Sequence, residues 1–293
     1  MFAMLLPALA ASAQEAPAPA VENVIVTAPK ERPEKTLDNF IIAHALPSPG
    51  LGKIGRWKLG ICPVTLGLPP KFDQFVTRRI VQVAAMVGAP LDDSEPCRPN
   101  VTVLATDQPQ ELIDLIRTRH GALLGYHYLY QARDIATVRR PVQSWYSTAT
   151  EDFWGIIQAD EPGLYLRKIL PKDPGMPSVV HVSGFRDMDG LKSRFATALI
   201  VVDTRKIAGQ EIGALADYIA MLALSQAKSY DACQEVPSIT NLFADCGDRA
   251  RPAGLTDIDV AYLRGLYRMN AGVNFIGERG SIAYEMKKVL GGY

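Results

Sequence analysis

The sequence holds few of the residues that most often carry metal or nucleophilic chemistry: among its 293 residues, four are histidines and four are cysteines. Structural zinc sites commonly place two cysteines at C-x-x-C spacing, and no pair here has that spacing. The histidines show no metal-binding spacing either, so we expect no metal site and no cofactor. These histidines are His44, His120, His127 and His181.

An excess of positive charge is also missing. Lys and Arg together number 31, as do Asp and Glu, so the formal net charge is zero. A protein that binds nucleic acid electrostatically needs a basic surplus to neutralise phosphates. We therefore expect no nucleic-acid partner. The sequence also lacks the G-x-S-x-G elbow, which argues against an α/β-hydrolase. It has no Gly-rich phosphate loop at the start of the domain, which argues against a short-chain dehydrogenase.

The apolar run at the N-terminus is too short to span a bilayer, which takes about 20 residues. It covers residues 2–11 (FAMLLPALAA), and the small residues Ala11, Ser12 and Ala13 suit signal peptidase. We interpret residues 1–13 as a signal peptide. The sequence then predicts a periplasmic or secreted protein without a transmembrane segment.

The number of cysteines is even, as expected for an exported protein stabilised by disulfides. Four cysteines allow three pairings. We predict Cys62–Cys97 and Cys233–Cys246, because each of these pairs lies within one half of the chain. Closing such loops typically stabilises a fold by about 3 kcal/mol each.

Composition divides the chain into a leading segment and one domain. Residues 14–35 are rich in Ala and Pro, which predicts a tether, and we assign 14–49 to this tether and leading segment. Residues 50–293 show no internal repeat and no second linker of comparable length. They are long enough for one sizeable core, so we expect a single globular domain.

Strand and helix patterns alternate along this domain. Period-2 and β-branched runs predict strands at 57–62, 100–106, 142–149, 178–183 and 196–202. Helical spacing and capping patterns predict helices at 70–87, after a cap at Asp107, at 210–227, after a capping box of Thr256 and Asp259, and at 281–290. We predict an α/β (α+β) fold in which helices pack a mixed sheet that two disulfides support.

A resemblance to a known family rests on the string LTDIDVAYLRGLY at residues 255–267. This string resembles the helix that closes the catalytic domain of metzincin-type zinc peptidases, which implies a zincin-like fold. In that family the preceding helix carries H-E-x-x-H-x-x-G-x-x-H. Here Asp217 stands at the first histidine position, Tyr218 at the glutamate, Met221 at the second histidine and Ala227 at the third. The resemblance therefore implies a degenerate pseudopeptidase that lacks the zinc ligands and the peptidase activity.

Residues 216–226 and 237–239 also resemble a group of uncharacterised exported bacterial proteins, which implies no activity.

Asp217 is the sole charge between residues 212 and 224, so this helix should be deeply buried. A buried carboxylate must be paired or hydrogen-bonded. We weigh a structural anchor bonded to a neighbouring loop against a polar binding site. If Asp217, Tyr218 and Met221 border a cleft, that cleft is the first candidate for a ligand site.

Aromatic side chains are densest at Trp145, Tyr146, Phe153 and Trp154. Trp145 and Tyr146 are further candidate ligand-binding residues, because aromatic side chains can line a groove for a peptide or glycan. The alternative is an aromatic face of the sheet inside the core.

A serine–histidine–aspartate triad can be drawn from His181, Ser183 and Asp203, since the first two share one face of a strand. The alternative is a strand histidine satisfied by a local hydrogen bond.

These observations favour a non-catalytic, exported binding or interaction protein whose partner is an envelope protein or peptide. The alternatives are a hydrolase with an unrelated serine- or carboxylate-based site and a structural accessory of the cell envelope.

Overall fold

The computed structural model describes residues 34–125, 131–160, 180–185, 188–227 and 232–291. The compact unit runs from Pro33 to Tyr293. The predicted signal peptide and most of the Ala/Pro-rich tether lie outside the described residues.

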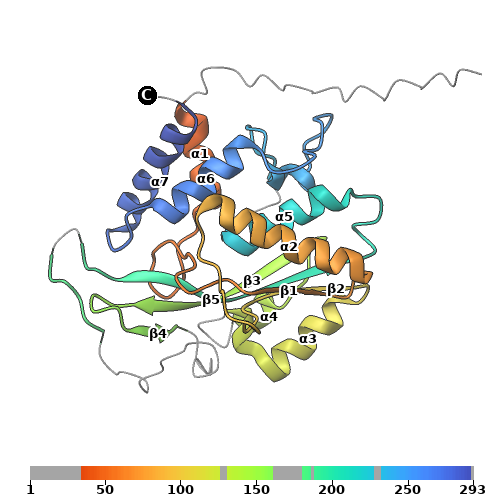
Figure 1. The fold of residues 1–293 in the computed structure, drawn as a ribbon, viewed down its shortest axis with the longest axis horizontal. Coiled ribbons are helices and arrows are strands. Elements are labelled where there is room, and N and C mark those ends of the chain that lie inside the picture. The colour runs from red at the N-terminus through yellow and green to blue at the C-terminus, as the bar shows by residue number, and fades with distance from the viewer. Residues whose placement is uncertain (1–33, 126–130, 161–179, 186–187, 228–231, 292–293) are drawn as a thin grey trace, which may run out of the picture. The chain divides into compact units, whose positions relative to one another are not determined.

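A five-stranded mixed sheet in the order β1-β2-β5-β3-β4 forms the centre of the fold (Figure 1). β1 and β2 are parallel to β5, whereas β3 is antiparallel to β5 and to β4. The predicted fold class, a mixed sheet packed by helices, is confirmed. The strands are β1 (Pro63–Leu66), β2 (Val101–Thr106), β3 (Val142–Glu151), β4 (Ile157–Ala159) and β5 (Lys192–Asp203).

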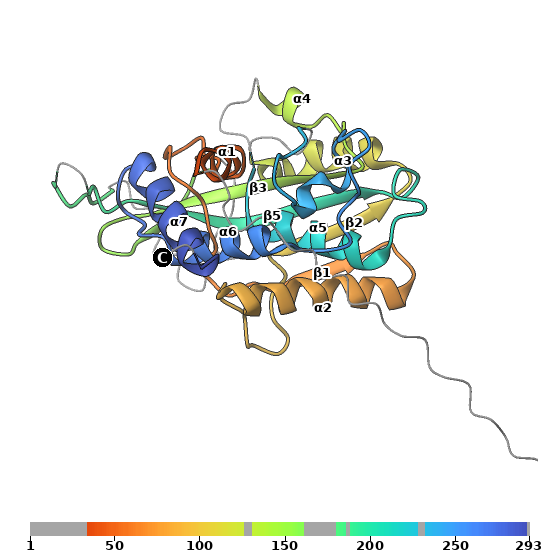
Figure 2. The ribbon, with the colours of Figure 1, turned by 90° about the horizontal axis from the view of Figure 1, so that it is seen from above.

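Helices cover both faces of this sheet, as Figure 1 shows, and Figure 2 shows α5 and α6 lying over it from above. The larger core includes α1 (Glu34–His44), α2 (Pro70–Val87), α5 (Ile212–Leu224), α6 (Asp257–Arg268) and α7 (Phe275–Val289). The opposite face packs against α3 (Pro109–His120), with the short α4 (Ala132–Ile135) beside it.

Alternation along β5 assigns its side chains to these two layers. Ile200 and Val202 pack into the larger core, and Leu199 and Val201 pack into the smaller one. Successive side chains of a strand point to opposite faces, so a strand covered on both sides reads as a continuous apolar run. The stretch ATALIVV at 196–202 has this pattern, and its predicted strand is confirmed.

The predicted helix at 70–87 is confirmed with the same bounds. Pro70 occupies the first turn, where a missing N–H costs nothing, and Val76, Ile80 and Val83 form its buried stripe. The helix ends because Gly88 adopts the left-handed conformation, with φ of 78°, that other residues avoid.

The helix α5 is buried almost all round, so its C-terminal carbonyls cannot reach water. Three aromatic side chains supply the donors that these carbonyls lack. Trp57 Nε1 donates to the Ala223 carbonyl over 2.8 Å, and Tyr267 Oη donates to that of Leu224 over 2.9 Å. Tyr146 Oη donates to the Leu222 carbonyl over 2.6 Å. The end of α5 therefore ties together distant parts of the chain.

The folded unit begins earlier than residue 50, where sequence analysis places it. Phe40 and Ile41 of α1 are buried in the larger core. His44, at the end of α1, lies against Thr240, with Nε2 3.2 Å from the hydroxyl oxygen, and burial lowers the pKa of His44 to about 4. Sequence analysis misses the helix α1 because it directly follows a Pro-rich stretch and is assigned to the same leading segment.

Both predicted disulfides, Cys62–Cys97 and Cys233–Cys246, are confirmed. The first joins the residues that precede β1 and β2. Asn100 supports it, because its amide oxygen accepts from the Cys62 N–H over 2.8 Å.

Three local predictions are wrong. Within residues 57–62 only Ile61 forms an isolated bridge, to Leu91, and the strand is β1, which begins at Pro63. The described part of 178–183 is not a strand, because the His181 N–H donates to the Asp152 carboxylate instead of a neighbouring strand. Asp107 does not cap α3, which begins after Gln108 without a side-chain cap.

The capping box of Thr256 and Asp259 is present at the start of α6, as predicted. Within the described ranges, no helix is both long and apolar enough to cross a membrane.

We predict that Tyr146→Phe and Tyr267→Phe each lower the free energy of unfolding by about 1–3 kcal/mol, because each leaves a buried carbonyl of α5 without its donor. Urea denaturation measures this loss. Tyr284→Phe, at an exposed position on α7, is the matched control and should change stability little. Equal effects at all three positions would show that the hydrogen bonds to α5 contribute nothing specific.

Candidate functional site

The sequence-predicted ligand residues of α5 lie inside the protein and do not border one of the described cavities. Asp217 pairs with Arg79 of α2, and Arg79 Nη2 donates to Asp217 Oδ2 over 3.1 Å. The Leu255 N–H donates to the same oxygen over 2.9 Å. Asp217 thus joins α2, α5 and the loop before α6, while Met221 is fully buried. These contacts are structural, and a ligand role for the residues stays a prediction.

Trp145 and Tyr146 lie on opposite faces of β3, so they cannot line one groove. Trp145 packs in the smaller core, where its Nε1 donates to the Ile135 carbonyl over 2.7 Å. Tyr146 packs in the larger core, with its ring stacked on Phe195. Both are structural aromatics, in agreement with the alternative of a sheet face inside the core.

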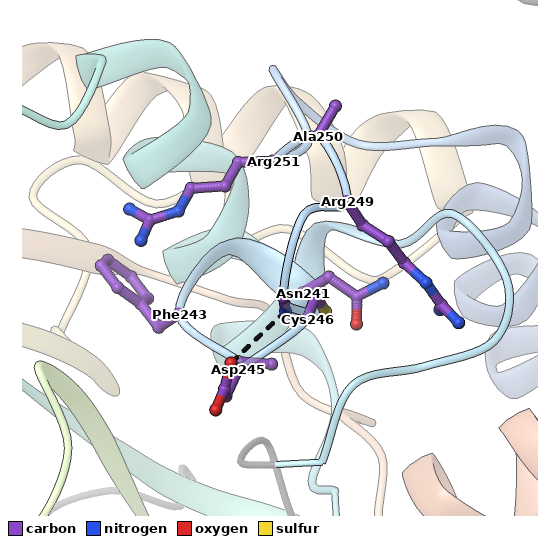
Figure 3. A pocket seen from close by; sticks show the side chains of 9 residues that line it. Asn241, Phe243, Asp245, Cys246, Arg249, Ala250 and Arg251 are labelled. Atoms are coloured by element: carbon purple, nitrogen blue, oxygen red, sulfur yellow. Dashed lines mark hydrogen bonds between the residues drawn. The ribbon is translucent and has the colours of Figure 1, made fainter.

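A surface pocket of about 300 Å³ lies beside the Cys233–Cys246 disulfide. Figure 3 shows Phe243 and Arg251 on one side of this loop and Arg249 on the other. Arg249 Nη1 donates to the Gln234 carbonyl over 3.1 Å, so this guanidinium braces the loop. Phe243 meets the buried ring of Tyr218 edge to face, so this pocket adjoins one of the α5 residues that the sequence singles out.

A second cavity, of about 270 Å³, lies at the carboxyl ends of β2 and β5. The chain leaves β2 toward α3 on one face and leaves β5 toward α5 on the other. Ligands of α/β proteins often bind where neighbouring strands diverge in this way. Here Asp203 is buried and Arg205 Nε donates to it over 3.2 Å. Burial alone would raise the pKa of Asp203, but the hydrogen bonds and charge of Arg205 outweigh it and lower the pKa.

The opposite end of the sheet carries a histidine paired with a buried carboxylate. Asp152, directly after β3, has a fully buried side chain whose oxygens accept from the backbone N–H groups of Trp154, Ile156 and His181. The carboxylate also lies 2.7 Å from His181 Nδ1. Burial alone would raise the pKa of Asp152, but the hydrogen bonds from His181 and the backbone outweigh it and lower the pKa.

The triad drawn from the sequence is therefore wrong in its acid. His181 pairs with Asp152, while Asp203 lies at the far end of β5 with Arg205. Ser183 Oγ contacts the Met188 carbonyl and accepts from the Phe185 N–H over 3.2 Å, so this hydroxyl supports a turn. The string EDFWG at 151–155 indicates a turn that Asp152 could support, but nothing in it points to His181.

Large exposed apolar side chains gather around this dyad, and we call the group the aromatic tip. Trp154 is 71% exposed and Phe185 73%. The ring of Trp154 meets those of Phe153 and His181 edge to face. The aromatic tip comprises Phe153, Trp154, Val180, Val182, Phe185 and Met188.

The base of the aromatic tip is braced. Glu151 pairs with Arg194 over 2.6 Å and with Lys192 over 3.1 Å, and Lys53 pairs with Asp189. Gly190 has φ of 80°, and a Cβ there would stand 2.7 Å from the Phe153 ring, so only glycine allows this approach. Figure 1 shows β4 at the end of the sheet opposite α3.

Family models, curated proteins and solved structures give no match to this chain.

The described residues include no group of three or more His, Cys, Asp or Glu side chains that could hold a metal ion. Glu278 of α7 is a buried carboxyl group with a hydrogen bond to only one of its two oxygens. The Ile54 N–H donates to its Oε2 over 2.8 Å, while Oε1 has no partner. Burial raises the pKa of Glu278 to about 7.

A raised pKa makes Glu278 stabilising only while it is protonated. This stability is complete below the pKa of a glutamate in the unfolded chain, about 4.3, and is lost as the pH rises through 7. Glu278→Gln should therefore match the unfolding free energy of the wild type at pH 4 and exceed it by a few kcal/mol at pH 8. Urea denaturation across this range tests it. A difference that does not vary with pH would assign the effect to packing.

Proposed function

We propose that the protein is an exported interaction protein whose aromatic tip binds an apolar segment of an envelope protein or peptide. The observation that carries this proposal is the concentration of exposed aromatic and aliphatic side chains at one end of the sheet, on a braced support. Soluble proteins rarely expose contiguous apolar patches, and such patches commonly mark interaction sites.

Pre-organisation of the aromatic tip favours binding. The Phe153 N–H donates to the His181 carbonyl over 2.9 Å, and Asp152 fixes the turn that carries Trp154. Aromatic side chains lose little conformational entropy when a partner covers them, and they dominate the energy of many interfaces. A rigid apolar surface therefore loses less free energy on binding than a mobile one.

The export proposal draws support from the two disulfides, since such bonds form and persist mainly in oxidising compartments. The lost-zincin proposal rests on the sequence resemblance at residues 255–267 alone. Export and a lost zinc site are both compatible with binding at the aromatic tip, which lies away from α5 at the end of β3.

Photo-cross-linking in the cells that produce the protein tests this proposal. Benzoylphenylalanine in place of Phe185 should give discrete adducts, because Phe185 is the most exposed member of the aromatic tip, at 73%. The same probe in place of Ile276, which is 79% exposed on α7, is the matched control and should give none. Trp154→Ala should remove the adducts formed from position 185. Adducts of equal yield at both positions, or adducts that persist in Trp154→Ala, would contradict the proposal.

A further inference from the structure

The geometry of Asp152 fixes the tautomer of the neutral His181 ring. The carboxylate is buried and accepts three backbone N–H groups, an arrangement that stabilises the ionised form. An ionised carboxylate is an acceptor only, so the His181 nitrogen 2.7 Å away must carry the proton. The neutral ring of His181 therefore has its proton on Nδ1 and its lone pair on Nε2.

Nε2 of His181 has no hydrogen-bond or ion-pair partner among the described residues. The side chain is 40% exposed, and no other described residue forms a hydrogen bond or ion pair with it beyond Asp152. His44 provides the contrast within the same chain. Both of its ring nitrogens lie within hydrogen-bonding distance of protein oxygens, and the residue is fully buried, as expected for a structural histidine. Within the part of the chain that the structure describes, His181 instead combines an orienting carboxylate with a nitrogen that has no protein partner, which is the pairing that general bases use.

The residues around His181 indicate which substrate and which nucleophile this histidine could serve. Trp154 offers apolar surface to an acyl chain, since it is 71% exposed and its ring meets the His181 ring edge to face. Ser183 is engaged in its turn through Met188 and Phe185, so water is the better candidate for the nucleophile.

We propose that His181, oriented by Asp152, is a general base that hydrolyses esters of small apolar acids bound on the aromatic tip. Nε2 takes a proton from water as the water oxygen attacks the acyl carbon. The ester C–O bond then breaks, the acid forms, and the alkoxide takes the proton back from Nε2. No other reactant is needed. This inference goes beyond the proposed binding function and rests on it, because both use the same surface.

Hydrolysis of 4-nitrophenyl butyrate by the full chain tests the step. General-base catalysis typically contributes about 10²–10⁴-fold, so His181→Gln should lower kcat/KM by at least about 100-fold. His120→Gln removes an exposed histidine of α3 and should leave the rate unchanged. A wild-type rate no higher than that of equimolar free imidazole, or an equal loss in both variants, would overturn the proposal.

Asp152 acts as a positioning residue and needs its own readout. Asp152→Asn should lower kcat with KM kept, because the carboxylate that orients the ring and stabilises the imidazolium is gone. Trp154→Ala should instead raise KM. Ser183→Ala should retain the activity, and a loss as large as that of His181→Gln would overturn the direct attack by water.

The non-hydrolysable amide N-(4-nitrophenyl)butanamide separates this inference from the proposed function. Trp57 and Trp145 are buried, so quenching of the exposed Trp154 reports occupancy of the aromatic tip. Quenching by the amide without hydrolysis of the ester would overturn the catalytic step and leave binding intact. Absence of both would count against both.

Discussion

The buried carboxyl end of α5 is the constraint on which the rest of the structure depends. Burial stabilises a helix that is apolar on every side, but it leaves the carbonyls of the last turn without hydrogen-bond donors. Trp57, Tyr146 and Tyr267 resolve this conflict by donating to those carbonyls from three different parts of the chain. Because the donors come from the loop before β1, from β3 and from α6, satisfying one helix end fixes how the sheet and the helical layer meet.

A similar solution recurs at the end of α6. Arg56 Nη1 donates to the carbonyls of Leu266, Tyr267 and Met269, and burial lowers the pKa of this guanidinium to about 10. At both helix ends, buried polar side chains thus donate hydrogen bonds to backbone carbonyls. Asp152 differs, because this buried carboxylate orients side chains that remain exposed.

Much of the fold could be predicted where the local pattern and the tertiary environment agree. The helix α2, the strand β5, the capping box of α6 and both disulfides follow from spacing and residue type alone. The candidate site could not be predicted in the same way. Asp152 and His181 are far apart in sequence, and hydrogen bonds from a carboxylate replace the strand pairing that the pattern around His181 suggests. Trp145 and Trp154 look alike in sequence, yet one is in the core and the other is exposed, because only the first lies within the covered part of β3.

The Cys62–Cys97 disulfide helps to keep the edge strand β1 paired with β2. β1 is one of the two edge strands, has four residues and pairs with β2. The bond closes a loop that contains β1 and α2, so it holds the short strand beside its neighbour. Without it, departure of β1 would uncover the backbone of β2, and an unpaired edge of this kind is a template for pairing with another chain. The disulfide thereby protects the protein against aggregation through the edge of its own sheet.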